Sequence, residues 1–311
     1  MISKIAKTVL KSIVTSKVSK IIASRNFGRD LFFLIARNYT PSVVSNVTGI
    51  TYNVSTSDRT VGREVFLTGG FDAQCIKQVF DILDSLGYKE REGKIFLDVG
   101  ANIGTTTLPA IKVFGFSDAI AFEPEPNNYK LLRQNIVAND LEKHIQTLNV
   151  AVSDKEATVS FEVCAVNSGD SRVRAEVSKH IDNHYQEDVR EVISVRAITL
   201  DSFLTASNVS ADDIGLAWID TQGHEGHVLN GAQSLLNTKV PVLVEYWPYA
   251  LARADGLELL EQNVMSKYTH FIDIREVGED VKGSLTPSSK IRELREKYQG
   301  TSLTDILLLK V

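Results

Sequence analysis

An acid and several small residues follow an apolar run at residues 95–97, and residues 98–104 read Asp-Val-Gly-Ala-Asn-Ile-Gly. Glycines let the backbone turn tightly, and a helix expected to begin near Thr105 would offer free N–H groups to a ligand. The pattern therefore predicts a ligand-binding turn made by Asp98, Gly100, Asn102 and Gly104. A dinucleotide-binding turn would read Gly-x-Gly-x-x-Gly, and Asn102 and Thr105 break that pattern. An acid at the strand end also repels a pyrophosphate, whereas it suits the cationic amino group of a methionine moiety.

A second acid, Glu123, ends the next apolar run, residues 119–122. In a doubly wound sheet this position lies beside the end of the first strand, where ligands bind. A carboxylate there can accept hydrogen bonds from both ribose hydroxyls of an adenosyl ligand. The two acids together thus favour an adenosyl ligand that carries a cationic amino acid.

At this point the chain resembles the FkbM family of S-adenosylmethionine-dependent methyltransferases, from about Asp58 to the C-terminus. The resemblance rests on segments in a shared order: residues 98–104, 122–124, 151–154, 199–203, 219–225 and 229–232, and Glu245. It implies that Asp98, Gly100, Asn102 and Gly104 hold the methionine end, Glu123 the ribose, and Ala151 and Val152 the adenine. The family often shows Asp-x-Glu-Gly-x-Glu where this chain has Asp220-Thr-Gln-Gly-His-Glu225, so a role that needs a charge at Gln222 is in doubt.

The catalytic candidates follow the later strands. Asp220 follows the apolar run 216–219, Glu245 ends the run 242–244, and such strand ends face the crevice where ligands bind. Methyl transfer requires an aligned acceptor and removal of its proton, which a carboxylate or an imidazole can perform. We therefore predict Asp220, His224 and Glu245 as catalytic residues. His227 belongs to the same pool, although both histidines also fit ordinary positions at a helix start.

The elements that must position these residues alternate between strands and helices. Strand-like runs at 95–99, 119–122, 145–152, 216–219 and 242–245 are separated by helical patterns at 105–113, 127–138, 225–236 and 257–264. We predict an α/β fold with a doubly wound, seven-stranded, mostly parallel sheet, closed by a final antiparallel pair at 270–274 and 305–309. Residues 91–311 form the predicted methyltransferase domain. Residues 1–90 form an accessory region with a basic helix, a strand pair at 50–55 and 65–71, and a helix at 74–86.

Composition limits the partners. A formal net charge of -5 offers no basic surface for phosphates, so we expect no nucleic-acid partner. Cys75 and Cys164 are read as reduced structural thiols of a cytoplasmic protein, and no metal site is expected. His180 and His184 have metal-like spacing, but such pairs are usually solvated. The segment around them, with the polar turn at 167–171, is a candidate for substrate selection.

The N-terminal residues 1–29 carry seven basic residues and no acid, with apolar residues at helical spacing. Three interpretations stay open: a transit peptide, a peripheral membrane-surface helix, and a helix that packs on the protein or a partner. No apolar run approaches the ~20 residues that a membrane span needs.

The predicted reaction is methyl transfer from S-adenosylmethionine to a hydroxyl of a small-molecule or glycan-type substrate, and the choice of oxygen rests on the family resemblance. Two rivals remain: a nucleotide-dependent oxidoreductase on a similar sheet, and a non-catalytic S-adenosylmethionine-binding or scaffold protein. The broken glycine pattern argues against the first, and the intact strand-end acids argue against the second.

Overall fold

The computed structural model describes residues 25–174, 185 and 187–311. The chain divides into two compact units, Met1–Phe71 and Asp72–Val311. The sequence places the boundary at residue 90, so the helix α5 (Ala73–Ser85) is counted with the accessory region there but with the larger unit here. Whether function divides at either point stays a prediction. None of the helices in the described ranges is long and apolar enough to cross a bilayer.

The smaller unit contains α3 (Arg25–Ala36), β1 (Ser42–Ser45), β2 (Tyr52–Ser55) and α4 (Val61–Thr68). β1 and β2 form the antiparallel pair, so the prediction of a strand at residues 65–71 is wrong. Val61, Val65 and Phe66 are buried at helical spacing, and Gly69 ends α4 in the left-handed conformation, with φ 90°. Most of the basic N-terminal segment, residues 1–24, lies outside the described residues.

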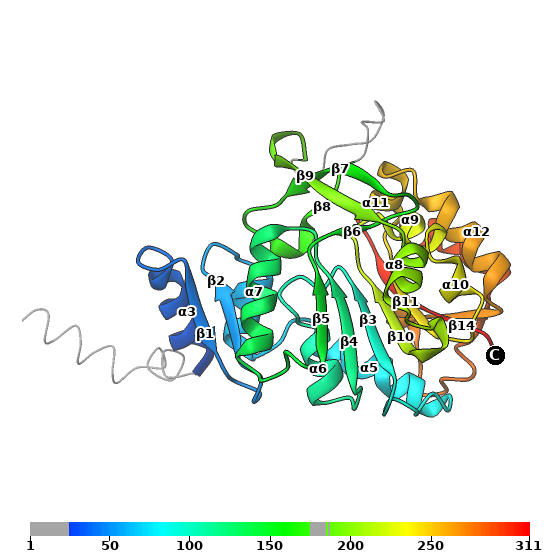
Figure 1. Cartoon of the computed structure of the whole chain (residues 1–311), viewed down its shortest axis with the longest axis horizontal. Helices are drawn as coiled ribbons and strands as arrows, with labels where there is room; N and C mark the ends of the chain where they lie inside the picture. Colours follow the sequence, from blue (N-terminus) through cyan, green and yellow to red (C-terminus); the bar gives the residue numbers. More distant parts are fainter. Residues whose placement is uncertain (1–24, 175–184, 186) are drawn as a thin grey trace, which may run out of the picture. The chain divides into compact units, whose positions relative to one another are not determined.

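The larger unit is built on an eight-stranded sheet in the order β13-β12-β14-β11-β10-β3-β4-β5 (Figure 1). Its parallel strands are β3 (Ile95–Val99), β4 (Asp118–Phe122), β5 (Ile145–Leu148), β10 (Ile214–Ile219) and β11 (Val242–Tyr246). The predicted seven-stranded, mostly parallel sheet is confirmed, and the two-residue β13 (Thr286–Pro287) adds an eighth strand at one edge.

The last strands close the sheet by insertion. β14 (Thr304–Leu309) lies between β11 and β12 (His270–Asp273) and is antiparallel to both. The antiparallel pair expected from the sequence is present. The added information is that β14 brings Asp305 directly opposite Glu245 of β11.

Helices cover both faces of this sheet. On one face, the aromatic rings of Phe80 in α5 and Phe96 in β3 both pack on Phe116, which follows α6 (Thr107–Lys112). The other face carries α8 (Leu200–Ser207), α9 (Glu225–Asn230), α10 (Gln233–Leu236) and α12 (Leu257–Lys267), whose apolar residues share one core with β3, β4, β10 and β11. α7 (Pro126–Val137) leads from β4 to β5, while α11 (Pro248–Arg253) and α13 (Leu294–Lys297) lie later in the chain.

A second sheet, of order β6-β9-β7-β8, follows the carboxyl end of β5 (Figure 1). Its strands are β6 (Ala151–Val152), β7 (Ala157–Val163), β8 (Arg172–Val173) and β9 (Glu191–Ile198). The single strand predicted at 145–152 is therefore wrong, because β5 and β6 belong to different sheets. β9 ends at Ile198, and the Thr199 side chain accepts from Ser202 N to begin α8, a helix that the sequence analysis did not predict. His180 and His184 lie outside the described residues.

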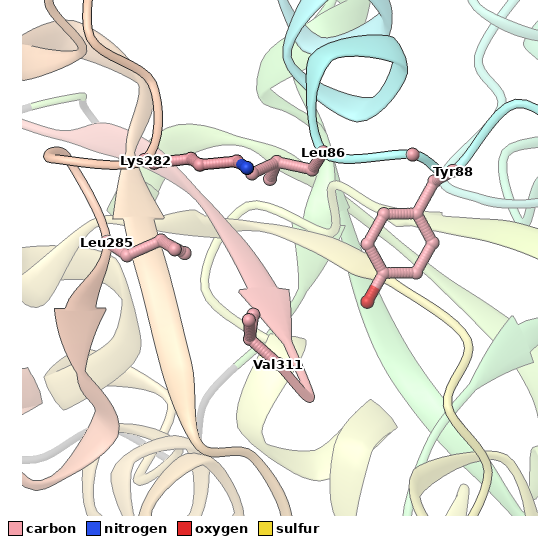
Figure 2. Close-up of a pocket in the computed structure, with 6 residues that line it drawn as sticks. Leu86, Tyr88, Lys282, Leu285 and Val311 are labelled. Carbon is pink, nitrogen blue, oxygen red and sulfur yellow. The ribbon is translucent and has the colours of Figure 1, made fainter.

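A pocket of about 450 Å³ lies at the opposite edge of the main sheet (Figure 2). It is lined by Leu86, Gly87, Tyr88, Lys282, Leu285 and Val311. Leu86–Tyr88 precede β3 and Val311 follows β14, which places the pocket at the amino ends of the parallel strands. The residues predicted to do chemistry gather at the carboxyl ends, so this pocket is separate from them.

Candidate functional site

The ends of β3 and β4 lie side by side, with Val99 paired to Phe122. Beyond Val99 the chain turns sharply, and the amides of Gly100 and Ala101 both donate to the Phe122 carbonyl, at 3.0 and 2.9 Å. Asn102 has φ 50°, a left-handed conformation that is uncommon outside glycine and often found at functional sites. The turn predicted from residues 98–104 is therefore built onto the strand that carries Glu123.

Glu123 is held by the backbone on both sides of its carboxylate. Its Oε2 accepts from Asn102 N and its Oε1 from Glu125 N, each at 2.8 Å. Burial raises the pKa of Glu123 to about 8, and the backbone donors only partly offset that effect. A carboxylate has about four acceptor positions. The two bonds therefore leave acceptor capacity on each oxygen, and this donor set fits a ligand that carries neighbouring hydroxyls.

Asp98 is buried beneath the same turn, with 1% of its surface exposed. The hydroxyls of Thr106 and Thr107 both donate to Asp98 Oδ2, the first at 2.6 Å, and tie β3 to the start of α6. Burial raises the pKa of Asp98 to about 6. In the described contacts Asp98 positions the turn, and its predicted contact with the methionine end stays a prediction.

Gly100 joins this turn to the next strand of the site. It has φ 96°, and a Cβ atom placed on it would lie 1.8 Å from the backbone oxygen of Asp220. Asp220 N donates in turn to Val99 O at 2.9 Å. Glycine is required at position 100 because the two backbone segments are in contact. The sequence analysis interpreted Gly100 as part of a ligand-binding turn, and the structure adds that it fixes the position of Asp220.

Asp220 and Glu245 are brought together by Gln222. The Gln222 Nε2 amide donates to Asp220 Oδ1 at 2.7 Å and to Glu245 Oε2 at 3.2 Å, from a backbone with φ 57°. A glutamate at this position could not donate to either carboxylate. The departure from the family pattern at Gln222 therefore replaces a charge with a donor shared by two acids.

These acids sit in a buried acidic group. Burial raises the pKa of Asp220 to about 6 and that of Asp305 to about 7, and the charge of Asp220 adds to the rise at Asp305. The pKa of Glu245 lies well above its usual value, first because of burial and then because of its acidic neighbours. Asp305 lies directly across the β11–β14 pair from Glu245. A cationic group bound here would be stabilised by the ionised acids.

Glu225 completes this group and is already satisfied by the chain. It accepts from Thr221 N at 2.7 Å, from Thr221 Oγ1 at 2.9 Å and from Gly223 N at 3.0 Å. Oxygens of Asp220, Glu225 and Glu245 lie within 4.8 Å of one another, a spacing compatible with a cation. Thr221 and Gly223 hold Glu225, and the Gln222 amide joins Asp220 to Glu245, so hydrogen bonds of the chain account for how these carboxylates are placed.

His224 is placed differently from the two acids. Its Nε2 lies 2.9 Å from Ser153 Oγ, and its ring stacks on His227 with a centroid separation of 4.5 Å. Burial lowers the pKa of His224 to about 3, so the ring is neutral at physiological pH. Asp220 and Glu245 are joined through one amide, and the catalytic roles of all three residues stay predictions.

Ala151 and Val152, predicted to line the adenine, form β6 and are 4% and 2% exposed. Both side chains pack in hydrophobic clusters, and contact with a base stays a prediction. The sequence analysis missed Asn149, whose Nδ2 donates to the carbonyls of Glu123 and Pro124 at 2.8 and 3.0 Å. An asparagine that directly follows a strand end was the available signal.

The polar turn at residues 167–171 contacts the turn at residues 98–104. Ser168 Oγ donates to Asn102 Oδ1 at 3.2 Å, and Asp170 forms ion pairs with Arg172 and Arg190. The sequence analysis did not select these arginines, because their importance depends on the register of a hairpin that periodicity does not define.

Comparisons with known proteins point to one family. A family model described as the methyltransferase FkbM domain matches residues 98–277. The 2-O-methyltransferase NoeI of Sinorhizobium fredii (strain NBRC 101917 / NGR234) is 24% identical over 165 residues, which cover 50% of this chain and 65% of that protein. The chain thus matches less than two thirds of the length of this relative.

Solved structures with similarity include a methyltransferase FkbM from Methylobacillus flagellatus KT, at 14% identity and TM-score 0.39, over 69% of this chain and 43% of that one. TYW2 from P. horikoshii, in complex with MeSAdo, has 12% identity and TM-score 0.41, over 86% of this chain and 70% of that one.

Proposed function

Because the chain belongs to the methyltransferase FkbM domain family, we propose that it transfers a methyl group from S-adenosylmethionine to a hydroxyl oxygen of a small-molecule or glycan-type acceptor. One observation carries the proposal. Glu123 ends the strand beside a left-handed turn, and the backbone of that turn holds its carboxylate with acceptor capacity left over. Two ribose hydroxyls are the donors that this arrangement suits.

When bound, S-adenosylmethionine supplies a methyl group on a positively charged sulfur. The residues that would hold it are Glu123 for the ribose, the turn at residues 98–104 for the methionine end, and Ala151 and Val152 for the adenine. The buried Glu245 and the half-buried Asp220 and Asp305 would supply negative potential at the strand ends when ionised, because charges interact more strongly where they are shielded from water.

Asp220 and Glu245 are the proposed proton acceptors. Transfer to an oxygen forms an O–C bond, breaks the S–C bond and releases the hydroxyl proton, which a carboxylate oxygen of Asp220 or Glu245 takes. The raised pKa of Asp220, about 6, favours this role, because a base works best when its pKa lies near the operating pH. Glu245 is a candidate because the Gln222 amide holds it beside Asp220. The Gln222 amide keeps both acids in place.

The nature of the acceptor is supported by charge and by a distant relative. The relative NoeI is named a 2-O-methyltransferase, which favours oxygen as the acceptor atom. The formal net charge of -5 disfavours a polyanion, so we propose no nucleic-acid partner. The free thiols of Cys75 and Cys164 favour a cytoplasmic location, which we also propose.

Thermal unfolding with ligands tests the proposal. S-adenosylmethionine and its demethylated product should each raise the unfolding midpoint. At a hundredfold excess over the dissociation constant, a ligand raises the free energy of unfolding by ~2.7 kcal/mol. A nicotinamide dinucleotide should not raise it. Stabilisation by the dinucleotide alone would favour the oxidoreductase. Stabilisation by the adenosyl ligands without label transfer to hydroxyl acceptors would favour a non-catalytic binding protein, and label transfer to a tRNA pool would overturn the choice of acceptor.

A further inference from the structure

Three buried polar side chains near the carboxyl ends of the strands carry atoms without a hydrogen-bond partner in the described part of the chain. They are Glu162 in β7, Arg172 in β8 and Trp247 at the start of α11, and they are 1%, 4% and 3% exposed. Among the residues that the structure describes, five atoms of these side chains have no hydrogen-bond partner: both carboxylate oxygens of Glu162, the Nε and Nη1 of Arg172, and the indole Nε1 of Trp247. Each such buried group costs ~1–3 kcal/mol unless something satisfies it.

These residues are neighbours, and we call them the orphan cluster. Glu162 and Arg172 are directly opposite each other in the antiparallel β7–β8 pair, so their side chains share one face of the sheet. The guanidinium carbon of Arg172 lies over the Trp247 ring, 5.1 Å from its centroid, and 5.8 Å from the ring centroid of Tyr185. The side chains of Glu162 and Trp247 therefore lie on either side of Arg172, next to two aromatic rings.

The charges of the orphan cluster are balanced even though its hydrogen bonds are not. Arg172 Nη2 pairs with Asp170, and Glu162 Oε1 lies 3.5 Å from Arg253 and 3.8 Å from Arg174. Glu162 and Arg172 are of opposite charge and face each other across the strand pair, yet they form no ion pair within 4.0 Å. A buried pair that stays apart in this way leaves donors and acceptors for a third group.

The orphan cluster also borders the catalytic acids. Trp247 follows Glu245 by two positions at the end of β11, and the positive charge of Arg172 is near enough to lower the pKa of Glu245. A group held by the orphan cluster is therefore held beside a proposed proton acceptor.

We propose that Glu162, Arg172 and Trp247 bind the acceptor, and that the acceptor is a neutral ring bearing several hydroxyls, such as a sugar. An anion would satisfy Arg172 and Trp247 but would be repelled by Glu162, and a cation would meet the reverse problem. Hydroxyls both accept and donate, so two or more of them on one ring satisfy both sets of atoms. The rings of Trp247 and Tyr185 supply apolar surface for the face of such a ring.

Unpartnered atoms alone do not define a site. Tyr52 and Tyr268 also bury a hydroxyl without a partner, and Asn167 an amide oxygen, but each of these is a single atom. Tyr268 precedes β12 at the amino edge of the sheet. The orphan cluster differs because five such atoms, of both donor and acceptor type, belong to three neighbouring residues.

The inference rests on the proposed function, and the experiment separates the two. With the full chain and S-adenosylhomocysteine present, binding of methyl α-D-mannopyranoside and of mannose 6-phosphate is measured by ligand-observed NMR. We expect the neutral glycoside to bind at least fivefold more tightly than the phosphate. Trp247→Phe keeps the ring and removes one orphan donor, and should weaken glycoside binding about 2- to 10-fold, the value of one hydrogen bond.

A matched control is Tyr268→Phe, which removes a buried unpartnered hydroxyl away from the site and should leave glycoside binding unchanged. In the absence of ligand, Trp247→Phe removes an unsatisfied N–H but also part of a packed ring, so its unfolding midpoint serves to verify that the variant is folded. Unchanged glycoside binding by the folded variant would overturn the proposal. The proposal would also be overturned if S-adenosylhomocysteine stabilised the protein but the glycoside failed to bind. Tighter binding of the phosphate than of the glycoside would overturn it too. Absence of that stabilisation would instead count against the proposed function.

Discussion

The region around the turn at residues 98–104 and the orphan cluster differ in whether their buried polar groups have hydrogen-bond partners. At the turn, Asp98 and Glu123 are held by threonine hydroxyls and by backbone amides. In the orphan cluster, Glu162, Arg172 and Trp247 keep five atoms without hydrogen bonds. Asp98 and Glu123 belong to the main sheet, whereas Glu162 and Arg172 belong to the second sheet.

The difference matches two kinds of ligand. A turn whose polar groups already have hydrogen-bond partners is rigid before the ligand binds. This suits a cofactor that binds in every catalytic cycle, whatever the acceptor. Unsatisfied groups are costly in the free protein, and the cost is recovered only when a complementary partner binds. The first region can therefore be common to a family, whereas the second can select one acceptor.

Gly100→Ala should have the largest effect, because the new Cβ would lie 1.8 Å from the Asp220 oxygen. We expect a loss of stability on the order of 3 kcal/mol or more and loss of S-adenosylmethionine binding, measured by chemical denaturation and calorimetry. Gly115→Ala is the matched control, since Gly115 has a similar φ of 82° but no atom within 4 Å of a Cβ. Its cost should be about 1–2 kcal/mol from backbone strain alone. Equal losses in the two variants would show that the contact with Asp220 is unimportant.

Asp220→Asn should come next, with turnover lowered ~100- to 10,000-fold once an acceptor is known. The amide oxygen can still accept from Gln222 Nε2, so the fold and cofactor binding should persist. The measurement is the rate of label transfer at saturating cofactor. A rate within a few-fold of the unaltered protein would move the role to Glu245 or His224, which the same assay would then examine.

Glu123→Gln should weaken S-adenosylmethionine binding about 10- to 100-fold, the range expected when about two hydrogen bonds to the ribose are lost. Either orientation of the new amide turns an NH₂ group toward a backbone N–H, of Asn102 or of Glu125. The free protein should therefore also lose some stability, and calorimetry well below the unfolding midpoint is the suitable measurement. Glu142→Gln, at an exposed position, should bind as the unaltered protein does. An unchanged affinity in Glu123→Gln would exclude ribose binding by this residue.

The smallest expected effect is a pH dependence of unliganded stability. Burial raises the pKa of Asp220 from 3.8 to about 6 in the folded state. Its contribution to stability is therefore fully present below the unfolded-state pKa and is lost as pH rises through about 6. Asp220→Asn should gain stability relative to the unaltered protein between about pH 4 and pH 7, by about 1–3 kcal/mol, or several degrees. Asp140→Asn, an exposed position with φ 59°, should follow the unaltered protein in parallel. A constant difference between Asp220→Asn and the unaltered protein across this pH range would contradict the raised pKa.

The sequence by itself determined the sheet and the acids that end its strands. Apolar runs alternated with helical periodicity, and Asp98, Glu123, Asp220 and Glu245 each stood at the end of such a run, a local pattern that needs no knowledge of packing. It misjudged residues 65–71 and 145–152, where short apolar segments fit a strand, a helix or two strands equally well.

Only the tertiary structure decided which polar groups meet. Some of these contacts join segments that are distant along the chain: Asp220 and Glu245 share Gln222, and Gly100 packs against the backbone of Asp220. Another depends on hairpin register, because Glu162 faces Arg172 across the β7–β8 pair. Periodicity reports which face of an element is buried, but it carries no information about the partner across that face. For the same physical reason, the sequence could name candidate acids but could not show which buried atoms the fold leaves without a partner.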